Sequence, residues 1–354
     1  MKQKLNITDL KKIDQHNMLD LLLGFPRQCR QAFDIAKKIN LSQNYKDFKN
    51  IVFCGMGGSA IGADLVKSYL YFKSNVSITV VREYNLPSFV DENTLVFVSS
   101  YSGDTEETLS AYDEALKKRC KIIAISSGGK LKEKTFKDGF YFIEIPQGLP
   151  PRSSLGFLSI IPLGVLAKLM NLSIEKEIEE IIFLLEDLTN NLNPRISREK
   201  NIAKKIALDI YDKFVVSYSA SIHFDVVSMR FRGQLAENSK TLSSTHFFPE
   251  MNHNEIVGWA NPKKLLKKFI VVLFRDKLDH PRTQKRMEIT KTIFKKKNLK
   301  VIEIWSRGDS LLARIFSLIY IGDFISFYLA ILNKVDPMPV ERVAYLKEEL
   351  RKES

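Results

Sequence analysis

The pattern of apolar positions along the chain changes at about residue 45. Before that point, apolar residues recur at helical spacing, as at Met18, Leu21, Leu22 and Phe25, and Pro26 marks a break. Beyond it, short apolar runs alternate with helical stretches. The runs predict strands at Asn50–Cys54, Val76–Val81, Leu95–Ser99, Lys121–Ser126 and Tyr141–Ile145. Apolar strands that alternate with helices predict a parallel sheet covered on both faces.

A second alternation follows a change in composition. Residues 147–156 (QGLPPRSSLG) are rich in Pro, Gly and Ser, and 157–210 are mostly helical in pattern. Further strands are predicted at Phe214–Ser219, Phe269–Phe274 and Val301–Trp305, followed by an apolar helix over 312–332 and an amphipathic C-terminal helix. We therefore expect an α/β fold with three parts: 1–155, an N-terminal helix and a first sheet; 156–210, a helical connection; and 211–354, a second sheet with a C-terminal helix.

Composition and charge narrow the class of protein. The 354 residues allow two or three domains at the usual ~100–200 residues each. Three cysteines without paired spacing exclude a disulfide scaffold and a four-cysteine zinc module. The net charge of +13 comes mostly from lysines spread along helical stretches, and no arginine stripe is interleaved with aromatics. We interpret the charge as a solvated surface and expect no nucleic-acid partner.

Two apolar runs resemble membrane spans. Leu158–Ala167 has about half of the ~20 residues that a span requires. Leu312–Leu332 is long enough, but it contains Arg314 and Asp323, so we predict a buried helix of a large core. The first residues carry charges without the apolar run of a signal peptide. These patterns predict a cytoplasmic protein with no membrane partner.

The first candidate site is the glycine-rich turn GMGGSAIG, which follows the first predicted strand directly. Its residues Gly57, Gly58 and Ser59 precede a helix, whose free N–H groups and positive dipole end suit a phosphate. A dinucleotide site is an alternative, but the spacing is G-x-G-x-x-x-x-G and the nearest acidic residue, Glu83, lies too far along the chain. A plain strand-to-helix turn is a second alternative.

The second candidate site is the stretch SSYSGDTEET, at the end of another predicted strand. Four hydroxyl side chains lie within seven residues: Ser99, Ser100, Ser102 and Thr105. Helix capping by Ser102 or Asp104 is the alternative, but it explains one hydroxyl and not four. Because ligands of open parallel sheets bind at the carboxyl ends of strands, we expect both loops to form one phosphate pocket.

At this point the sequence resembles a known family. Ser100-x-Ser-x-x-Thr105 together with GMGGS resembles sugar isomerase (SIS) domains. PPRSSLG at 150–156, QLAEN at 234–238 and PEMNHNEIVGW at 249–259 resemble the bifunctional phosphoglucose/phosphomannose isomerases of archaea and bacteria. The resemblance covers nearly the whole chain. It implies two flavodoxin-like SIS subdomains, a homodimer, no metal and no cofactor, and interconversion of glucose 6-phosphate or mannose 6-phosphate with fructose 6-phosphate.

The resemblance also assigns roles to residues. Ser59, Ser100, Ser102 and Thr105 match the phosphate-binding hydroxyls, Arg152 the arginine near the enediolate, Glu237 the general base, His253 the ring-opening histidine and Lys347 the lysine at the ring oxygen. In the family, the histidine reaches the active site of the partner subunit. Two departures appear: Ala63 stands where glycine is expected, and the stretch 239–248 is less typical than its flanks.

The chemistry of the reaction favours these residue types independently. A carboxylate can move a proton between C1 and C2 of the sugar, and it works best if burial raises its pKa. A fixed guanidinium stabilises the enediolate, and a histidine can open the sugar ring near neutral pH. Room for the C2 hydroxyl in two positions would allow both aldose epimers to react.

Three alternatives remain open. The chain could isomerise another phosphosugar, or it could be a non-catalytic phosphosugar sensor, although no helix-turn-helix or other output module is visible. A zinc site formed by His246, Glu250 and His253 is conceivable, but the spacing matches no metal motif. We expect His16, His223, His246 and His280 to be structural.

Overall fold

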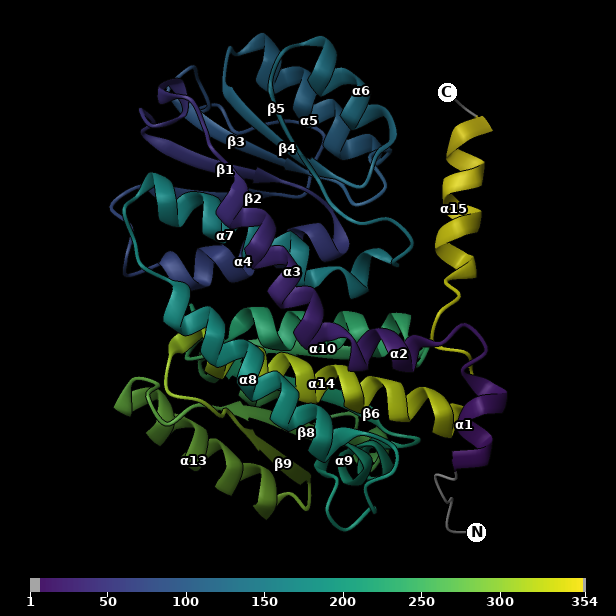
Figure 1. The fold of residues 1–354 in the computed structure, drawn as a ribbon. Helices are drawn as coiled ribbons and strands as arrows, with labels where there is room; N and C mark the ends of the chain where they lie inside the picture. Colours follow the sequence, from purple (N-terminus) through teal and green to yellow (C-terminus); the bar gives the residue numbers. More distant parts are fainter. Residues whose placement is uncertain (1–6, 353–354) are drawn as a thin grey trace.

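The computed structural model describes residues 7–352, and in it two parallel sheets sandwich a layer of helices (Figure 1). The strands are β1 (Asn50–Cys54), β2 (Ser77–Val81), β3 (Thr94–Ser99), β4 (Lys121–Ser126), β5 (Tyr141–Glu144), β6 (Phe214–Ala220), β7 (Ser243–Phe248), β8 (Phe269–Arg275) and β9 (Lys300–Trp305). Residues 1–6, which the predicted N-terminal helix included, lie outside the described residues.

The α-helices alternate with these strands, and three short 3₁₀ helices accompany them. They are α1 (Ile7–Ile13), α2 (Met18–Leu23), α3 (Phe25–Lys38), η1 (Gln43–Tyr45), α4 (Gly57–Leu70), α5 (Glu106–Lys117), α6 (Gly129–Lys137), η2 (Pro151–Ser153), α7 (Leu155–Leu169), α8 (Glu175–Leu192), α9 (Ile202–Ile210), α10 (Asp225–Glu237), η3 (Glu250–His253), α11 (Glu255–Gly258), α12 (Lys263–Leu266), α13 (Pro281–Lys296), α14 (Leu311–Asn333) and α15 (Glu341–Lys352).

The first sheet has the strand order β2-β1-β3-β4-β5, and every pair is parallel. This is the flavodoxin-like order, in which the chain changes direction between β1 and β3. Ligands of such sheets bind in the crevice at that switch point, outside the carboxyl ends of the strands. Both candidate phosphate loops follow these two strands, so the topology places them on either side of the crevice.

The second sheet repeats this plan with one strand fewer, in the parallel order β7-β6-β8-β9. The sequence pattern predicted β6, β8 and β9 to within one residue at each end, but it missed β7. The residues of β7, SSTHFF, are mostly polar and only partly buried. A strand at the edge of a sheet needs no continuous apolar run, which explains the omission.

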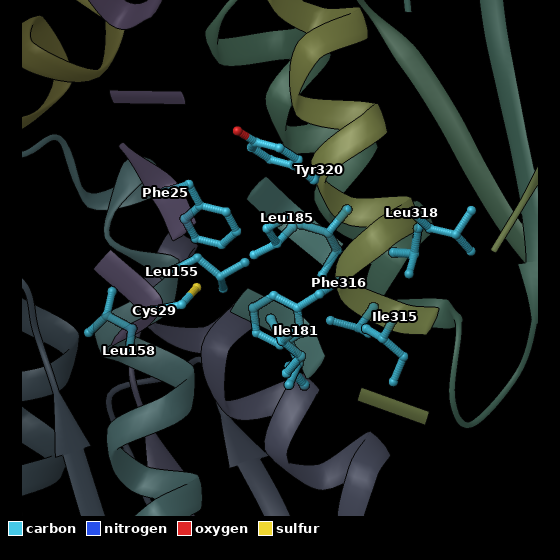
Figure 2. Packing of buried hydrophobic residues seen from close by; sticks show 14 of the residues in the cluster. Phe25, Cys29, Leu155, Leu158, Ile181, Leu185, Ile315, Phe316, Leu318 and Tyr320 are labelled. Carbon is cyan, nitrogen blue, oxygen red and sulfur yellow. The ribbon is translucent and has the colours of Figure 1, made fainter. Parts of the chain in front are cut away.

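The helices between the sheets share one core. In Figure 2, side chains of α3, α7, α8 and α14 converge, and Phe25 stacks on Phe316 and Tyr320 with ring centroids 6.1 and 5.7 Å apart. The outer faces are covered by α5 and α6 on the first sheet and by α13 on the second (Figure 1). Because helices from all three predicted parts contribute to this core, the division at 155 and 210 stays a prediction.

The apolar helix α14 lies at the centre of this layer. By length and composition it could cross a membrane, but its apolar window is entirely buried inside the protein. Apolar residues occur on every face of α14 because other elements of the protein enclose the helix on all sides. Its Asp323 is buried as well and pairs with Arg230, as described below.

Two features, one near each end of the described chain, add detail to the elements that the sequence predicted. The break at Pro26 is real, but the proline lies in the first turn of α3, where its missing N–H costs nothing, and so it begins a second helix. At the other end, α15 extends away from both sheets (Figure 1). Its apolar residues Val343, Leu346 and Leu350 are 47%, 58% and 45% exposed.

Candidate active site

The loop after β1 packs tightly against the PPRSS segment. Helix α4 begins at Gly57, and Ser59 in its first turn is buried. A Cβ atom on Gly58 would lie 2.5 Å from the Pro151 carbonyl oxygen, so only glycine allows this approach. The contact fixes η2, with Arg152, beside the first candidate phosphate loop. At the end of β2, where a dinucleotide fold needs an acid, the chain has Val81 and Arg82.

The loop after β3 is held by its own hydroxyls. The Ser100 hydroxyl donates to Thr105 Oγ1 at 2.9 Å and accepts from the Gly103 N–H at 3.1 Å. Gly103 has φ +79°, which suits glycine. Ser100 is buried and Ser102 is exposed. The loop therefore presents hydroxyls at the end of the strand, before the amides of α5.

Helix capping, the alternative for this loop, is wrong for the two residues considered. Helix α5 begins at Glu106, after Thr105, and no side chain caps it. The Ser102 hydroxyl accepts from the nearby Asp104 N–H at 3.3 Å. The Asp104 carboxylate accepts from the Lys130 N–H at 3.0 Å, in the first turn of α6. The first amides of α5 thus have no side-chain cap.

Arg152 is the most completely bonded group near these loops. Its side chain is 4% exposed. Nε donates to Asn238 Oδ1 at 2.8 Å, and Nη2 donates to the carbonyl oxygens of Pro337 and Met338 at 2.8 and 2.7 Å. Nη1 donates to the Glu237 carboxylate at 3.3 Å. Burial lowers the pKa of Arg152, and the charge of Glu237 opposes that shift.

Glu237 is the last residue of α10, and its side chain is 39% exposed. The carboxylate is therefore partly open to solvent in the single chain. The ion pair with Arg152 instead holds the carboxylate at the rim of the site. One carboxylate oxygen receives the arginine, which leaves the second oxygen available to a ligand.

A buried network underlies α10. Arg230 donates to both carboxylate oxygens of Asp323, at 3.0 and 2.7 Å, and to the Arg152 carbonyl oxygen at 3.0 Å. Gln234 donates to the same carboxylate at 3.0 Å. Burial raises the pKa of Asp323, and the arginine opposes this. The network fixes the face of α10 that carries Glu237, because positions 230 and 234 precede it at helical spacing.

Comparisons with known proteins give the family of this chain. A model of the bacterial phospho-glucose isomerase C-terminal SIS domain matches residues 199–350. A bifunctional phosphoglucose/phosphomannose isomerase of Caldicellulosiruptor bescii is 44% identical over 335 residues, covering 94% of this chain and 98% of that protein. One of Aquifex aeolicus is 40% identical, covering 90% and 94%. The chain belongs to the bifunctional phosphoglucose/phosphomannose isomerase family.

Among solved structures, a hypothetical protein of Thermus thermophilus has the same fold. The TM-score is 0.78 at 15% identity, with 98% of this chain and 94% of that chain covered. The chain is thus an enzyme of the isomerase family with two SIS subdomains, as the sequence predicted.

Two residues assigned by the resemblance lie apart from the others in this isomerase chain. His253 is exposed on η3, beyond the carboxyl end of β7, whereas Glu237 precedes the start of that strand. At ~3.3 Å per residue, the strand alone separates them by roughly 20 Å. Lys347 is exposed on the extended helix α15. A single chain brings together Arg152, Glu237 and the first phosphate loop, but neither His253 nor Lys347.

Sequence reasoning missed Lys240, Arg230 and the bonding role of Asp323. Asp323 had a usable signal, because an acid within an apolar helix requires a buried cation as partner. No such signal marks Lys240, because it follows the QLAEN motif in the stretch 239–248, which is less typical of the family than its flanks. Its surroundings are described below.

The zinc site considered at His246, Glu250 and His253 is not supported. Over residues 7–352, no three His, Cys, Asp or Glu side chains are grouped to hold a metal ion. His246 Nδ1 instead accepts from the Phe247 N–H at 2.7 Å, and Glu250 accepts from the Asn254 amide at 2.8 Å. These two side chains are therefore occupied by local bonds.

Proposed function

We propose that this chain interconverts glucose 6-phosphate and mannose 6-phosphate with fructose 6-phosphate through a cis-enediol, without a metal or a cofactor. The observation that carries the proposal is the Arg152–Glu237 pair, held at 3.3 Å beside a glycine-rich helix N-terminus. A guanidinium and a carboxylate next to a phosphate cradle are the groups that proton transfer in a phosphosugar needs.

The substrate phosphate binds between the two loops. Amides of Gly57 and Gly58 and the Ser59 hydroxyl receive it from one side, and Ser100, Ser102 and Thr105 from the other. The mutual bond between Ser100 and Thr105 supports this, because hydroxyls already facing one another can turn toward an anion. The N-terminal dipoles of α4 and α5 add to the attraction.

Glu237 carries the proton. Its carboxylate removes the proton from C2 of the open-chain aldose, the electron pair forms the enediolate, and the same group returns the proton to C1. The oxygen-bound proton moves from O2 to O1, so the product is the ketose and no redox partner is needed. Arg152 stabilises the negative charge that develops on the oxygens.

A second subunit supplies His253 in this account. The histidine is exposed on η3, which follows the carboxyl end of β7, whereas Glu237 of the same chain lies before the start of that strand. A homodimer would bring the partner's η3 to the exposed side of Glu237 and would exclude water from the carboxylate. His253 then opens the sugar ring, and Lys347 binds at the ring oxygen. We place the reaction in the cytoplasm.

A coupled assay of purified protein on fructose 6-phosphate, with chelator present, tests the proposal. Glucose 6-phosphate and mannose 6-phosphate are measured separately, and both are expected. If only one product formed, the proposed proton transfer would stand, and the enzyme would act on one aldose phosphate instead of two. Neither product would refute the proposal and favour a different phosphosugar, while tight binding of the sugar phosphates without turnover would favour a sensor.

A further inference from the structure

Lys240 lies at the junction between the end of α10 and the segment 336–340 that leads into α15. Its ammonium group donates to the carbonyl oxygen of Glu237 at 2.7 Å and to that of Asp336 at 2.9 Å. Longer bonds reach the carbonyl oxygens of Pro337 at 3.2 Å and Asn238 at 3.4 Å. One side chain therefore joins two parts of the chain that are about a hundred residues apart in sequence.

Arg152 and Lys240 share the Pro337 carbonyl oxygen. The guanidinium approaches it at 2.8 Å and the ammonium at 3.2 Å. The same short segment is bonded on another side by His16, whose Nδ1 lies 2.6 Å from the Asp336 carboxylate. Segment 336–340 is thus bonded directly to Arg152 and, through Lys240, to the backbone of Glu237.

A cavity of about 510 Å³ opens beside this junction. Its walls include Glu237 and Lys240 from the end of α10, and Val335, Asp336, Pro339 and the first residues of α15. Among these wall residues, Lys240 bonds both to the Glu237 carbonyl oxygen and to the Asp336 carbonyl oxygen.

We propose that Lys240 is a positioning residue of the isomerase site, whose ammonium group fastens the end of the helix that carries Glu237 to the segment that leads into α15. The inference rests on the proposed function, because the carboxylate that it positions is the proposed base. Lys240 fixes where α10 ends, and hence the direction of Glu237, and it fixes where α15 and its Lys347 begin.

The charge of this group is sensitive to pH. Burial, followed by the nearby Arg152, lowers the pKa of Lys240 to about 8. The groups that face it are Arg152 from η2, Glu237 from α10, Asp336 from the segment and Glu341 from α15, and the three acids oppose the shift. Below pH 8 the ammonium offers three donors to four carbonyls. Above it, the neutral amine offers two weaker ones.

The test uses full-length Lys240→Met and Lys240→Arg, with Lys264→Met, an exposed lysine on α12, as the matched control. In Lys240→Met we expect kcat to fall by on the order of tenfold or more at pH 7, with KM for fructose 6-phosphate changed less than about threefold. Hydrogen exchange in residues 336–343 should become faster. Lys240→Arg should restore kcat and retain it above pH 8, where the unsubstituted protein declines, because a guanidinium does not titrate there.

Unchanged kcat in Lys240→Met would overturn the inference, and so would a Lys240→Arg profile that still declines at pH 8. Because Lys240→Met could fold poorly, the alkaline limb of the well-folded arginine variant is the deciding comparison. These failures differ from failure of the proposed function, in which the unsubstituted protein itself produces no aldose phosphate.

Discussion

Arg152 donates to the carboxylate of Glu237 at 3.3 Å, although 85 positions separate the two residues in sequence. One belongs to η2, which packs on the first phosphate loop, and the other ends α10 above the second sheet. The pair therefore joins the two SIS subdomains at the candidate site. The close approach at Gly58 positions Arg152, and the Arg230–Asp323 network supports α10 below Glu237 and also bonds the Arg152 carbonyl oxygen.

Replacing Glu237 with Gln should abolish isomerisation and preserve binding. The amide cannot accept the C2 proton, and general base catalysis of this kind contributes ~10²–10⁴-fold. We expect kcat to fall by at least that range, while calorimetric affinity for fructose 6-phosphate changes little. Glu186→Gln, on the exposed side of α8, is the matched control and should retain full activity. Most of the activity remaining in Glu237→Gln would eliminate this residue as the base.

Gly58→Ala should damage the site through Arg152. The added Cβ would meet the Pro151 carbonyl oxygen at 2.5 Å and the Arg152 Cα at 3.3 Å, so η2 must shift. A displacement of about 1 Å at a catalytic group can cost on the order of 100-fold in rate. The activity loss should therefore exceed what the melting temperature explains.

Gly233→Ala provides the comparison for that variant. Gly233 lies within α10, and a Cβ there meets nothing within 4 Å. Alanine in a helix interior is favoured over glycine by ~1 kcal/mol, so this variant should be slightly more stable and fully active. If Gly58→Ala behaves in the same way, the close approach of η2 has no role in the site.

Mixing two inactive variants tests whether the active site is shared between subunits. Glu237→Gln and His253→Ala chains, unfolded together and refolded, should form mixed dimers in which one site holds both intact groups. Random pairing predicts recovery of about a quarter of the original activity. Each variant refolded alone should remain inactive. If the mixture also stays inactive while dimers form, His253 does not act across the interface.

The stability of the chain should fall as pH rises from about 4 to about 7 because of Asp279. Burial, and next the charge of Asp276, raise the pKa of Asp279 to about 7, and its Oδ2 is buried without a partner. Between about pH 4 and pH 7 the unfolded chain loses this proton before the folded one does, so folding becomes less favourable. The loss should be on the order of 2 kcal/mol once complete, after allowance for partial solvent screening.

Asp279→Asn removes that dependence. Its urea midpoint should exceed that of the unsubstituted protein at pH 8, and the difference should shrink toward pH 4. Asp113→Asn, an exposed acid that pairs with Lys134 at 2.7 Å, serves as the control and should show little pH-dependent difference. Equal midpoints for Asp279→Asn and the unsubstituted protein at pH 8 would contradict the account of this group.

Much of the fold could be predicted because the strands inside the sheets contain continuous apolar runs or are mostly apolar. β1 and β4 match their predicted bounds, since burial on both faces requires a run of apolar residues, here Ile51 to Cys54 in β1 and Ile122 to Ile125 in β4. Strand β7 was missed because an edge strand can use Ser, Thr and His. Arg314 and Asp323, two charged residues within an apolar run long enough for a membrane span, likewise predicted α14 as a core helix, and its burial confirms this.

The site was harder to predict than the fold. Local motifs indicate helix N-termini and hydroxyls, because those depend on neighbours in sequence. The bonds from Lys240 to Asp336 and from Arg152 to Pro337 join segments that are distant in sequence. The spacing of apolar and polar residues does not predict such bonds. The exposure of Glu237 could not be predicted from the sequence either, because burial at the end of a helix depends on what packs there, including a second subunit.

The central claim, that Glu237 moves a proton between C2 and C1, is tested most directly by isomerising fructose 6-phosphate in D₂O and locating deuterium in the products by NMR. A carboxylate that holds the proton while the enediolate forms can exchange it with solvent. We predict deuterium at C2 of both glucose 6-phosphate and mannose 6-phosphate, and no product in Glu237→Gln. Products that carry only protium at C2 and still form readily in Glu237→Gln would indicate direct hydride transfer and would contradict the account.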